Sequence, residues 1–130
     1  MNPRVLLVDD QQTAMNIRRR LLEQYGFTVR LAINSITCLD ALEKFAIDVV
    51  VLDYRLNDGV NGEELARSIR ARWPNTPLIM LTGVMDLPDT ARDVVDRVFI
   101  KGWSQPQEVI DAIRELAGDA NRGTLGESNC

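Results

Sequence analysis

The chain contains no histidine, which removes imidazole as a general base, a metal ligand and a carrier of phosphoryl groups. Its two cysteines, Cys38 and Cys130, form neither a disulfide framework nor a metal-ligand spacing. Long apolar runs are also absent: no segment approaches the ~18 residues that span a bilayer, and the N-terminus lacks the apolar region of a signal peptide. These absences predict a soluble, cytoplasmic protein whose chemistry depends on carboxylates, hydroxyls and lysine.

The composition is that of an ordinary globular protein, with 45% apolar and 26% charged residues among 130, a length that predicts one domain. The net charge is −4, and because nucleic-acid affinity depends on clustered Lys and Arg, nucleic acid is excluded as a direct partner. We predict a domain over residues 1–118. Residues 119–130 lose the apolar period and gain Gly, Asn and Ser, which predicts a polar tail or the stub of a linker.

Apolar runs and segments of helical period alternate along the chain. The runs typical of buried strands are Val5–Val8, Phe27–Ala32, Val49–Leu52, Leu78–Leu81 and Val98–Ile100. The helical segments are Gln12–Tyr25, Ser35–Ala46, Gly62–Arg72, a short one between Leu87 and Asp96, and one after Ser104. Strands that alternate with helices in this way predict an α/β fold, a doubly wound five-stranded parallel sheet with helices on both faces.

The apolar period also predicts which residues of each helix face the sheet. The expected inward residues are Ala14, Ile17, Leu21 and Tyr25 in the first helix, Leu39, Leu42, Phe45 and Ala46 in the second, and Leu65, Ala66 and Ile69 in the third. The last helix is expected to have Ser104 as its N-cap, Pro106 in the first turn and Gln107 completing a capping box.

Polar residues stand at the ends of four predicted strands. Asp9 and Asp10 follow the first strand, Asp53 the third, Thr82 the fourth and Lys101 the fifth. An Asp after a strand is more often a helix cap or a turn residue than a ligand, so each residue alone carries little weight. In a parallel α/β sheet, however, ligands bind beyond the carboxyl ends of the strands. The joint pattern therefore predicts one site at one edge of the sheet.

The residue types at this edge suit phosphoryl transfer. Three carboxylates held close together repel one another unless a cation holds them, and oxygen ligands without His or thiolate favour Mg²⁺. A carboxylate such as Asp53 can attack phosphorus to form an aspartyl phosphate, which requires positive charge around the transferring oxygens. Mg²⁺ and Lys101 supply that charge, and Thr82 supplies a hydroxyl donor.

These motifs resemble the receiver domain of two-component response regulators over roughly residues 4–117. VLLVDD with Asp9 and Asp10, VVVLDY with Asp53, LIMLTG with Thr82 and VFIKG with Lys101 occur in family order and nearly at family spacing. The resemblance implies a flavodoxin-like receiver fold with strand order 2-1-3-4-5. It also implies a phosphoacceptor domain that assists its own phosphorylation and dephosphorylation, and not an enzyme acting on a separate substrate.

The same resemblance assigns roles to the residues of the site. Asp53 would accept the phosphoryl group from a histidine kinase or a histidine phosphotransfer protein. Asp10, Asp53 and the backbone carbonyl of Arg55 would bind Mg²⁺, and Asp9 would act partly through water. Lys101 would pair with Asp53 before the reaction and with the phosphate afterwards, while Thr82 would hydrogen-bond the phosphate.

Phosphorylation would, by the same resemblance, switch the binding of a downstream protein or output domain. The surface implied for this binding, and for a homodimer where one forms, comprises the fourth helix, fifth strand and fifth helix. Neither nucleic acid nor a membrane is implied as a direct partner.

The sequence departs from the family pattern in ways that bear on the structure. Gly102 replaces the proline that usually follows the lysine, and because a cis non-proline peptide is costly, a trans bond is expected. Val98 stands where the family has its switch aromatic, so a coupled Tyr/Thr rotation is not carried over. Residues 56–62 form a turn-rich stretch, and the short interval from Thr82 to Lys101 predicts a fourth helix that is abbreviated or displaced.

Three other classes of protein share parts of this pattern. A Mg²⁺ phosphatase of the haloacid-dehalogenase type has a D-x-D motif, but Gln11 and Arg55 stand two residues after Asp9 and Asp53. A flavodoxin-like cofactor binder has a Gly- or Ser/Thr-rich first loop, whereas Asp9 and Asp10 would repel its phosphate. A phosphorylation-independent, receiver-like interaction module remains an open alternative.

Overall fold

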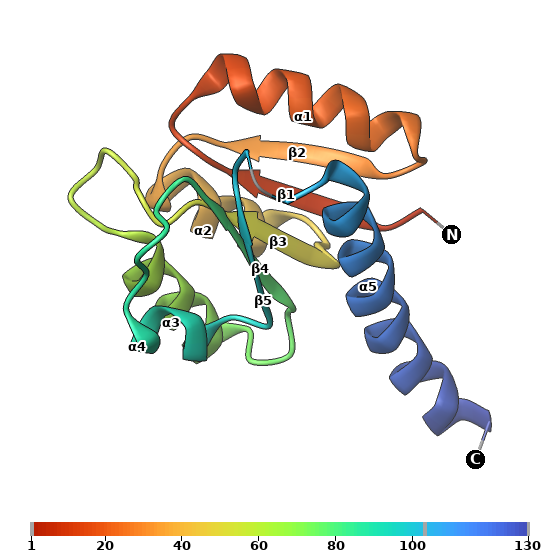
Figure 1. Ribbon diagram of the computed structural model, residues 1–130. Coiled ribbons are helices and arrows are strands. Elements are labelled where there is room, and N and C mark those ends of the chain that lie inside the picture. The colour runs from red at the N-terminus through yellow and green to blue at the C-terminus, as the bar shows by residue number, and fades with distance from the viewer. Residues whose placement is uncertain (1, 103, 130) are drawn as a thin grey trace.

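The computed structural model describes residues 2–102 and 104–129, and the side chains of residues 2–102 and 104–118. Strands and helices alternate within these residues: β1 (Arg4–Val8), α1 (Gln12–Gln24), β2 (Thr28–Ala32), α2 (Ser35–Lys44), β3 (Val49–Leu52), α3 (Gly62–Arg72), β4 (Leu78–Thr82), α4 (Asp89–Val94), β5 (Arg97–Ile100) and α5 (Pro106–Asn129). The five strands form one parallel sheet in the order β2-β1-β3-β4-β5 (Figure 1). The predicted fold class and strand order are confirmed.

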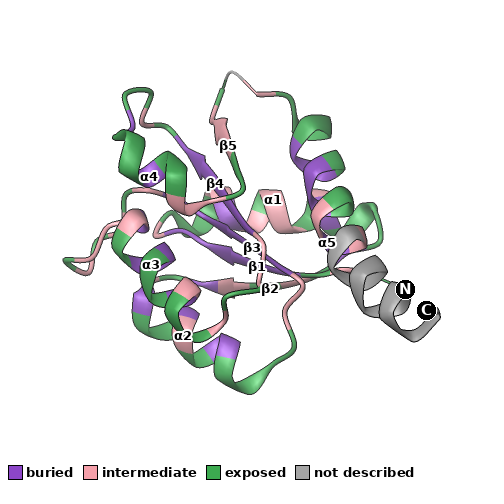
Figure 2. Cartoon of the chain, turned by 90° about the horizontal axis from the view of Figure 1, so that it is seen from below, coloured by how far each residue is buried: buried purple, intermediate pink, exposed green. Residues whose placement is uncertain are grey.

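Helices cover both faces of this sheet, and the inner strands are buried between them (Figure 2). In β1, Val5 and Leu7 pack with residues of α1 and α5, whereas Leu6 and Val8 pack with residues of α2 and α3. Because both faces are covered, the strands read as continuous apolar runs, without polar alternation. The polar residues that follow the strands therefore lie at the rim of a dry core.

Backbone hydrogen bonds extend the sheet one residue beyond its strands, at the rim that carries the polar residues. The Asp9 N–H donates to the Ala32 carbonyl at 3.1 Å, and the Asp53 N–H donates to the Val8 carbonyl at 3.0 Å. The Lys101 N–H donates to the Thr82 carbonyl at 2.8 Å. The backbone positions of these site residues are therefore fixed by the sheet.

The predicted inward face of α1 is wrong in part. Ile17 is 66% exposed and Tyr25 is 41% exposed, whereas Met15 and Leu22 are buried. The spacing from Met15 through Arg18 to Leu22 defines the face that packs on the sheet, and an arginine occupies its centre. Because a charged residue interrupts the face of Met15 and Leu22, the apolar pattern in the sequence favours the neighbouring face, which carries Ile17 and Tyr25.

The predicted face of α2 is also wrong at its end. The helix ends at Lys44, and Phe45 has extended backbone angles, so Phe45 and Ala46 lie exposed beyond it. The Arg30 guanidinium stacks 3.3 Å from the centroid of the Phe45 ring, a cation–π contact. The inward residues are Cys38, Ala41 and Leu42, with Leu39 half-buried. In α3 the predicted Leu65, Ala66 and Ile69 are all buried.

The start of α5 differs from the predicted cap. The helix begins at Pro106, a favourable first helical residue because its missing N–H would have no helical partner. The Ser104 hydroxyl accepts the Ile100 N–H at 3.1 Å, so it closes the turn after β5 and does not cap the helix. The Gln107 side chain donates to Asp111 at 2.8 Å, and a capping box is therefore not formed.

Several further predictions concern the turn after β5, α4 and the C-terminal residues. The Lys101–Gly102 bond is trans, as expected, and α4 is short. The helix α5 continues to Asn129, which differs from the loose tail predicted from the sequence, while the domain boundary at residue 118 stays a prediction.

Cys38 is buried, and Cys130 lies outside the described residues. Over the described part of the chain, no helix combines the length and hydropathy needed to cross a membrane.

Candidate functional site

Lys101 joins two buried carboxylates at the carboxyl ends of the strands. Its Nζ lies 2.7 Å from Asp9 Oδ2 and 2.8 Å from Asp53 Oδ2. Asp9 is 3% exposed and Asp53 7% exposed. Burial alone would lower the pKa of Lys101, but hydrogen bonds from its ammonium group to Asp53 and Asp9 outweigh burial and raise it. Lys101 is therefore charged at neutral pH and forms an ion pair with each carboxylate, which offsets one of their two negative charges.

The second oxygen of each buried carboxylate is held by the chain that follows it. Asp9 Oδ1 accepts the Gln11 N–H at 3.1 Å, and Asp53 Oδ1 accepts the Arg55 N–H at 3.2 Å. Both contacts are Asx-turns, in which an Asp side chain accepts the backbone N–H two residues later. Each carboxylate therefore has a defined orientation toward Lys101.

Asp10 lies beside the Asp9 and Asp53 carboxylates and has no ion-pair partner among the described residues. Its pKa is raised above the ordinary 3.8, first by burial and then by the neighbouring Asp9 and the charge of Asp53. The side of the cluster that carries Asp10 thus has excess negative charge. This is the electrostatic environment that a bound cation would relieve.

An open cleft of about 530 Å³ lies over these residues. It is lined by Asp10, Gln11, Asp53, Arg55, Asn57, Thr82, Gly83, Val84 and Lys101. Thr82 is fully buried within its strand, and its Oγ1 accepts the Val84 N–H at 3.2 Å. The hydroxyl proton of Thr82 is left for donation into the cleft, since this contact uses only an oxygen lone pair.

The loop between β3 and α3 forms one wall of the cleft and is fastened at two points. The Asp58 carboxylate accepts the Ser35 N–H at 2.8 Å and also the Ser35 hydroxyl, contacts that hold the pKa of Asp58 below its ordinary value. The Gly62 N–H donates to the Tyr54 carbonyl at 2.6 Å. A Cβ at position 62 would overlap the Asp53 carbonyl oxygen, so this close approach requires glycine.

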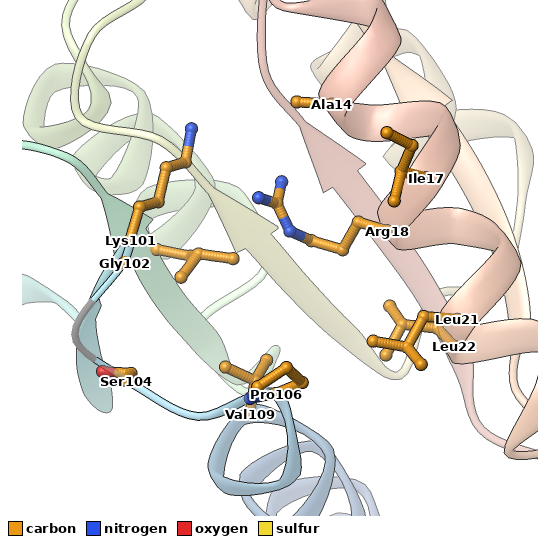
Figure 3. A pocket seen from close by; sticks show the side chains of 11 residues that line it. Ala14, Ile17, Arg18, Leu21, Leu22, Lys101, Gly102, Ser104, Pro106 and Val109 are labelled. Atoms are coloured by element: carbon orange, nitrogen blue, oxygen red, sulfur yellow. The ribbon is translucent and has the colours of Figure 1, made fainter.

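A second cation, Arg18, approaches the cluster from α1. Its Nη1 lies 3.8 Å from Asp9 Oδ2, the oxygen that also accepts Lys101. Figure 3 shows the Arg18 and Lys101 side chains reaching toward the same pocket from α1 and from the end of β5. Sequence reasoning missed Arg18, Asp58 and Gly62. A signal existed for Arg18, because its spacing from Met15 and Leu22 places it on the buried face of a helix.

The structure brings all the predicted site residues together. Asp9, Asp53 and Lys101 are in direct contact, while Asp10, Thr82 and the Arg55 position line the same cleft as Asp53. In residues 2–102 and 104–118, no three His, Cys, Asp or Glu side chains already surround one point. The metal set Asp9, Asp10, Asp53 and Arg55 therefore stays a prediction. Its oxygen donors and the excess charge at Asp10 fit a hard cation such as Mg²⁺.

Comparison with known families identifies the class of this protein. The family model described as response regulator receiver domain matches residues 5–114. The chain therefore belongs to the response regulator receiver domain family of two-component signalling. Membership implies, in general terms, a histidine kinase partner and a phosphoacceptor role, not that of a conventional enzyme.

Individual relatives agree with this family. The hydrogenase transcriptional regulatory protein HoxA of Cupriavidus necator is 28% identical over 128 residues, which cover 91% of this chain and 26% of HoxA. The chain thus spans about a quarter of that relative. A receiver domain protein from Methanospirillum hungatei has a TM-score of 0.86 at 23% identity, covering 95% of this chain and 99% of that one.

A further solved structure carries a ligand. TrrA of Thermotoga maritima, solved in complex with Mg(2+)-BeF, has a TM-score of 0.78 at 24% identity and covers 88% of this chain and 98% of its own. Similarity at this level of identity shows the shared fold.

Proposed function

We propose that this chain is the phosphoacceptor of a two-component phosphorelay, in which phosphorylation of Asp53 switches the binding of a downstream protein or output domain. The observation that carries the proposal is the contact of Lys101 with both Asp9 and Asp53, at a cleft that Thr82 and Asp10 share. Because these 130 residues contain no histidine, the phosphohistidine donor lies outside them, on a histidine kinase or a histidine phosphotransfer protein. We place this exchange in the cytoplasm.

The residues of the cleft divide the work of the transfer. An Asp53 carboxylate oxygen attacks phosphorus as the phosphorus–nitrogen bond of the donor breaks and the imidazole leaves. Lys101, already within 2.8 Å of Asp53, places positive charge beside the transferring oxygens, and the Thr82 hydroxyl donates to one of them. Mg²⁺, held by Asp10, Asp53 and the Arg55 carbonyl with Asp9 acting through water, would supply further positive charge.

The switch follows from the position of Thr82 at the end of β4. The chain from Thr82 leads through residues 83–88 into α4, and Leu87 and Ala91 of this region pack on Met80. A phosphoryl group on Asp53 adds charge and acceptor oxygens next to Thr82 and Lys101, which biases the arrangement of this segment. The surface of α4, β5 and α5 then presents the change to a partner. Val98 is half-buried against the same group and does not supply an aromatic rotation.

Hydrogen exchange with a phosphoryl mimic tests this function. Beryllofluoride with Mg²⁺ is expected to alter amide exchange in residues 83–100, because the mimic engages Thr82 and Lys101, while β2 and α2 keep their exchange rates. The matched control is Asp53→Ala, which lacks the oxygen that bonds beryllium and should show no change. Unaltered exchange in the wild-type protein, or an equal change in Asp53→Ala, would contradict the proposed switch.

A further inference from the structure

Arg18 contacts the acid cluster from α1, at Asp9, and does not line the open cleft. Its side chain is 23% exposed and contributes to a small void with Asp9 and Asp53. Arg18 is not among the described residues that line the cleft, and neither is Asp9. In Figure 3 the Arg18 guanidinium extends from α1 toward the Lys101 side of the pocket. Arg18 therefore affects a ligand in the cleft through its charge and its ion pair with Asp9, without lining the cleft.

The Arg18 guanidinium and the Lys101 ammonium share one carboxylate oxygen. Asp9 Oδ2 is 3.8 Å from Arg18 Nη1 and 2.7 Å from Lys101 Nζ. Within the described side chains, Asp9 is the carboxylate in ion-pair range of Arg18. Burial lowers the pKa of Arg18, opposed by the charges of Asp9 and Asp53, and a guanidinium stays protonated at neutral pH.

The formal charge of the cluster depends on Arg18. Three carboxylates, Asp9, Asp10 and Asp53, contribute −3, and Lys101 with Arg18 contributes +2, which leaves −1. Without Arg18 the same cluster would carry −2. The attraction of a divalent cation to the cluster grows with this negative charge, and partial burial limits screening by solvent and salt.

We propose that Arg18 is a resident counter-charge that weakens Mg²⁺ binding at the cluster by neutralising Asp9 from α1. The inference rests on the proposed function, because it takes Asp10 and Asp53 as the metal's carboxylates. Arg18 is a positioning residue, since it does not line the cleft and acts through Asp9. With Arg18 the metal-free cluster carries a formal charge of −1 instead of −2, so a higher Mg²⁺ concentration is needed to fill the site.

The test is the Kd for Mg²⁺, measured by isothermal titration calorimetry on the full chain. Arg18→Met keeps an unbranched chain that packs with Leu21 and Leu81, so the fold is retained. We expect Arg18→Met to bind Mg²⁺ about three- to tenfold more tightly than the wild-type protein, because one opposing charge near the metal is lost. Arg18→Lys keeps the charge and should restore a Kd near the wild-type value.

Arg20→Met is the matched control, because it removes the same charge from an exposed position two residues along α1. Its Kd should equal that of the wild-type protein. An unchanged Kd in Arg18→Met, or an equal tightening in Arg20→Met, would overturn the role of Arg18 while leaving the phosphoacceptor function intact. Absence of Mg²⁺ binding in the wild-type protein would overturn both. The Mg²⁺-induced rise in Tm should be larger in Arg18→Met, a readout that does not depend on phosphorylation.

Discussion

Replacing Lys101 with methionine is expected to slow phosphorylation of Asp53 by acetyl phosphate about a hundredfold or more, the usual effect of removing one preorganised charge donor. The Lys101 Nζ is 2.8 Å from Asp53 Oδ2, so its charge already stands where charge develops during transfer. The Lys101 N–H bond to the Thr82 carbonyl at 2.8 Å fixes the backbone from which this side chain extends, and methionine at position 101 would place no charge there. The rate is measured by intact mass at saturating Mg²⁺.

The control for this experiment is Lys44→Met. Lys44 is the only other lysine of the chain, and its side chain is 63% exposed on α2, where it pairs with Asp40 at 3.1 Å. The loss of an exposed pair of this kind changes stability by less than about 1 kcal/mol, and the phosphorylation rate should stay at the wild-type value. A Lys101→Met protein that is folded and phosphorylated at the wild-type rate would contradict the role of Lys101.

Asp10→Asn is expected to have two opposite effects, loss of Mg²⁺ binding and a higher Tm for the metal-free protein at neutral pH. The loss should be about tenfold or more in Kd, because a charged oxygen ligand is replaced by a neutral one. The gain follows from electrostatics: burial and the nearby Asp9 and Asp53 raise the pKa of Asp10, so its ionised form destabilises the folded state. Asparagine removes that cost together with the function.

The pH dependence gives the sign of this effect. A carboxyl group with a raised folded-state pKa binds protons more tightly in the folded than in the unfolded protein. The destabilisation of the folded protein by ionised Asp10 therefore grows as the pH rises from the ordinary pKa of 3.8 through the raised pKa. It is complete above the raised pKa. The Tm advantage of Asp10→Asn, measured by thermal unfolding in a chelator, should be largest at neutral pH and vanish below 3.8.

Asp93→Asn supplies the comparison, since Asp93 is exposed on α4 and does not line the cleft. It should leave both the Tm and the Mg²⁺ affinity unchanged. A metal-free Asp10→Asn protein with a Tm below that of the wild-type protein would show that ionised Asp10 stabilises the fold, the opposite of the effect that its raised pKa implies.

The strands, and the meeting of the polar residues at one edge of the sheet, could be predicted from the sequence because the strands depend on local signals. A parallel sheet covered on both faces needs continuous apolar strands. In the structure Asp9, Asp53 and Lys101 directly follow β1, β3 and β5, and Thr82 is the last residue of β4. Once the sheet was parallel, the polar residues that follow its strands had to share one edge. The clustering of the site was therefore a consequence of topology, and it required no knowledge of side-chain contacts.

The features that escaped prediction depend on tertiary contacts. The face of α1 predicted to be buried was wrong because Arg18 interrupts the true buried face. An arginine is tolerated there because it pairs with Asp9, which is nine residues earlier in the sequence. Ser104 resembles a helix cap in sequence, yet its hydroxyl accepts the Ile100 N–H across the turn. The requirement for glycine at position 62 arises from the Asp53 carbonyl, which only the folded loop brings close.

The measurement that tests phosphoryl transfer to Asp53 most directly is the intact mass after incubation with acetyl phosphate, with and without Mg²⁺, on the wild-type chain and Asp53→Ala. We predict a single phosphoryl adduct on the wild-type protein that requires Mg²⁺ and is absent from Asp53→Ala. Absence of an adduct on the wild-type protein under all conditions would contradict phosphoryl transfer to Asp53 and would favour a phosphorylation-independent interaction module. An adduct of equal yield on Asp53→Ala would place the acceptor at another residue.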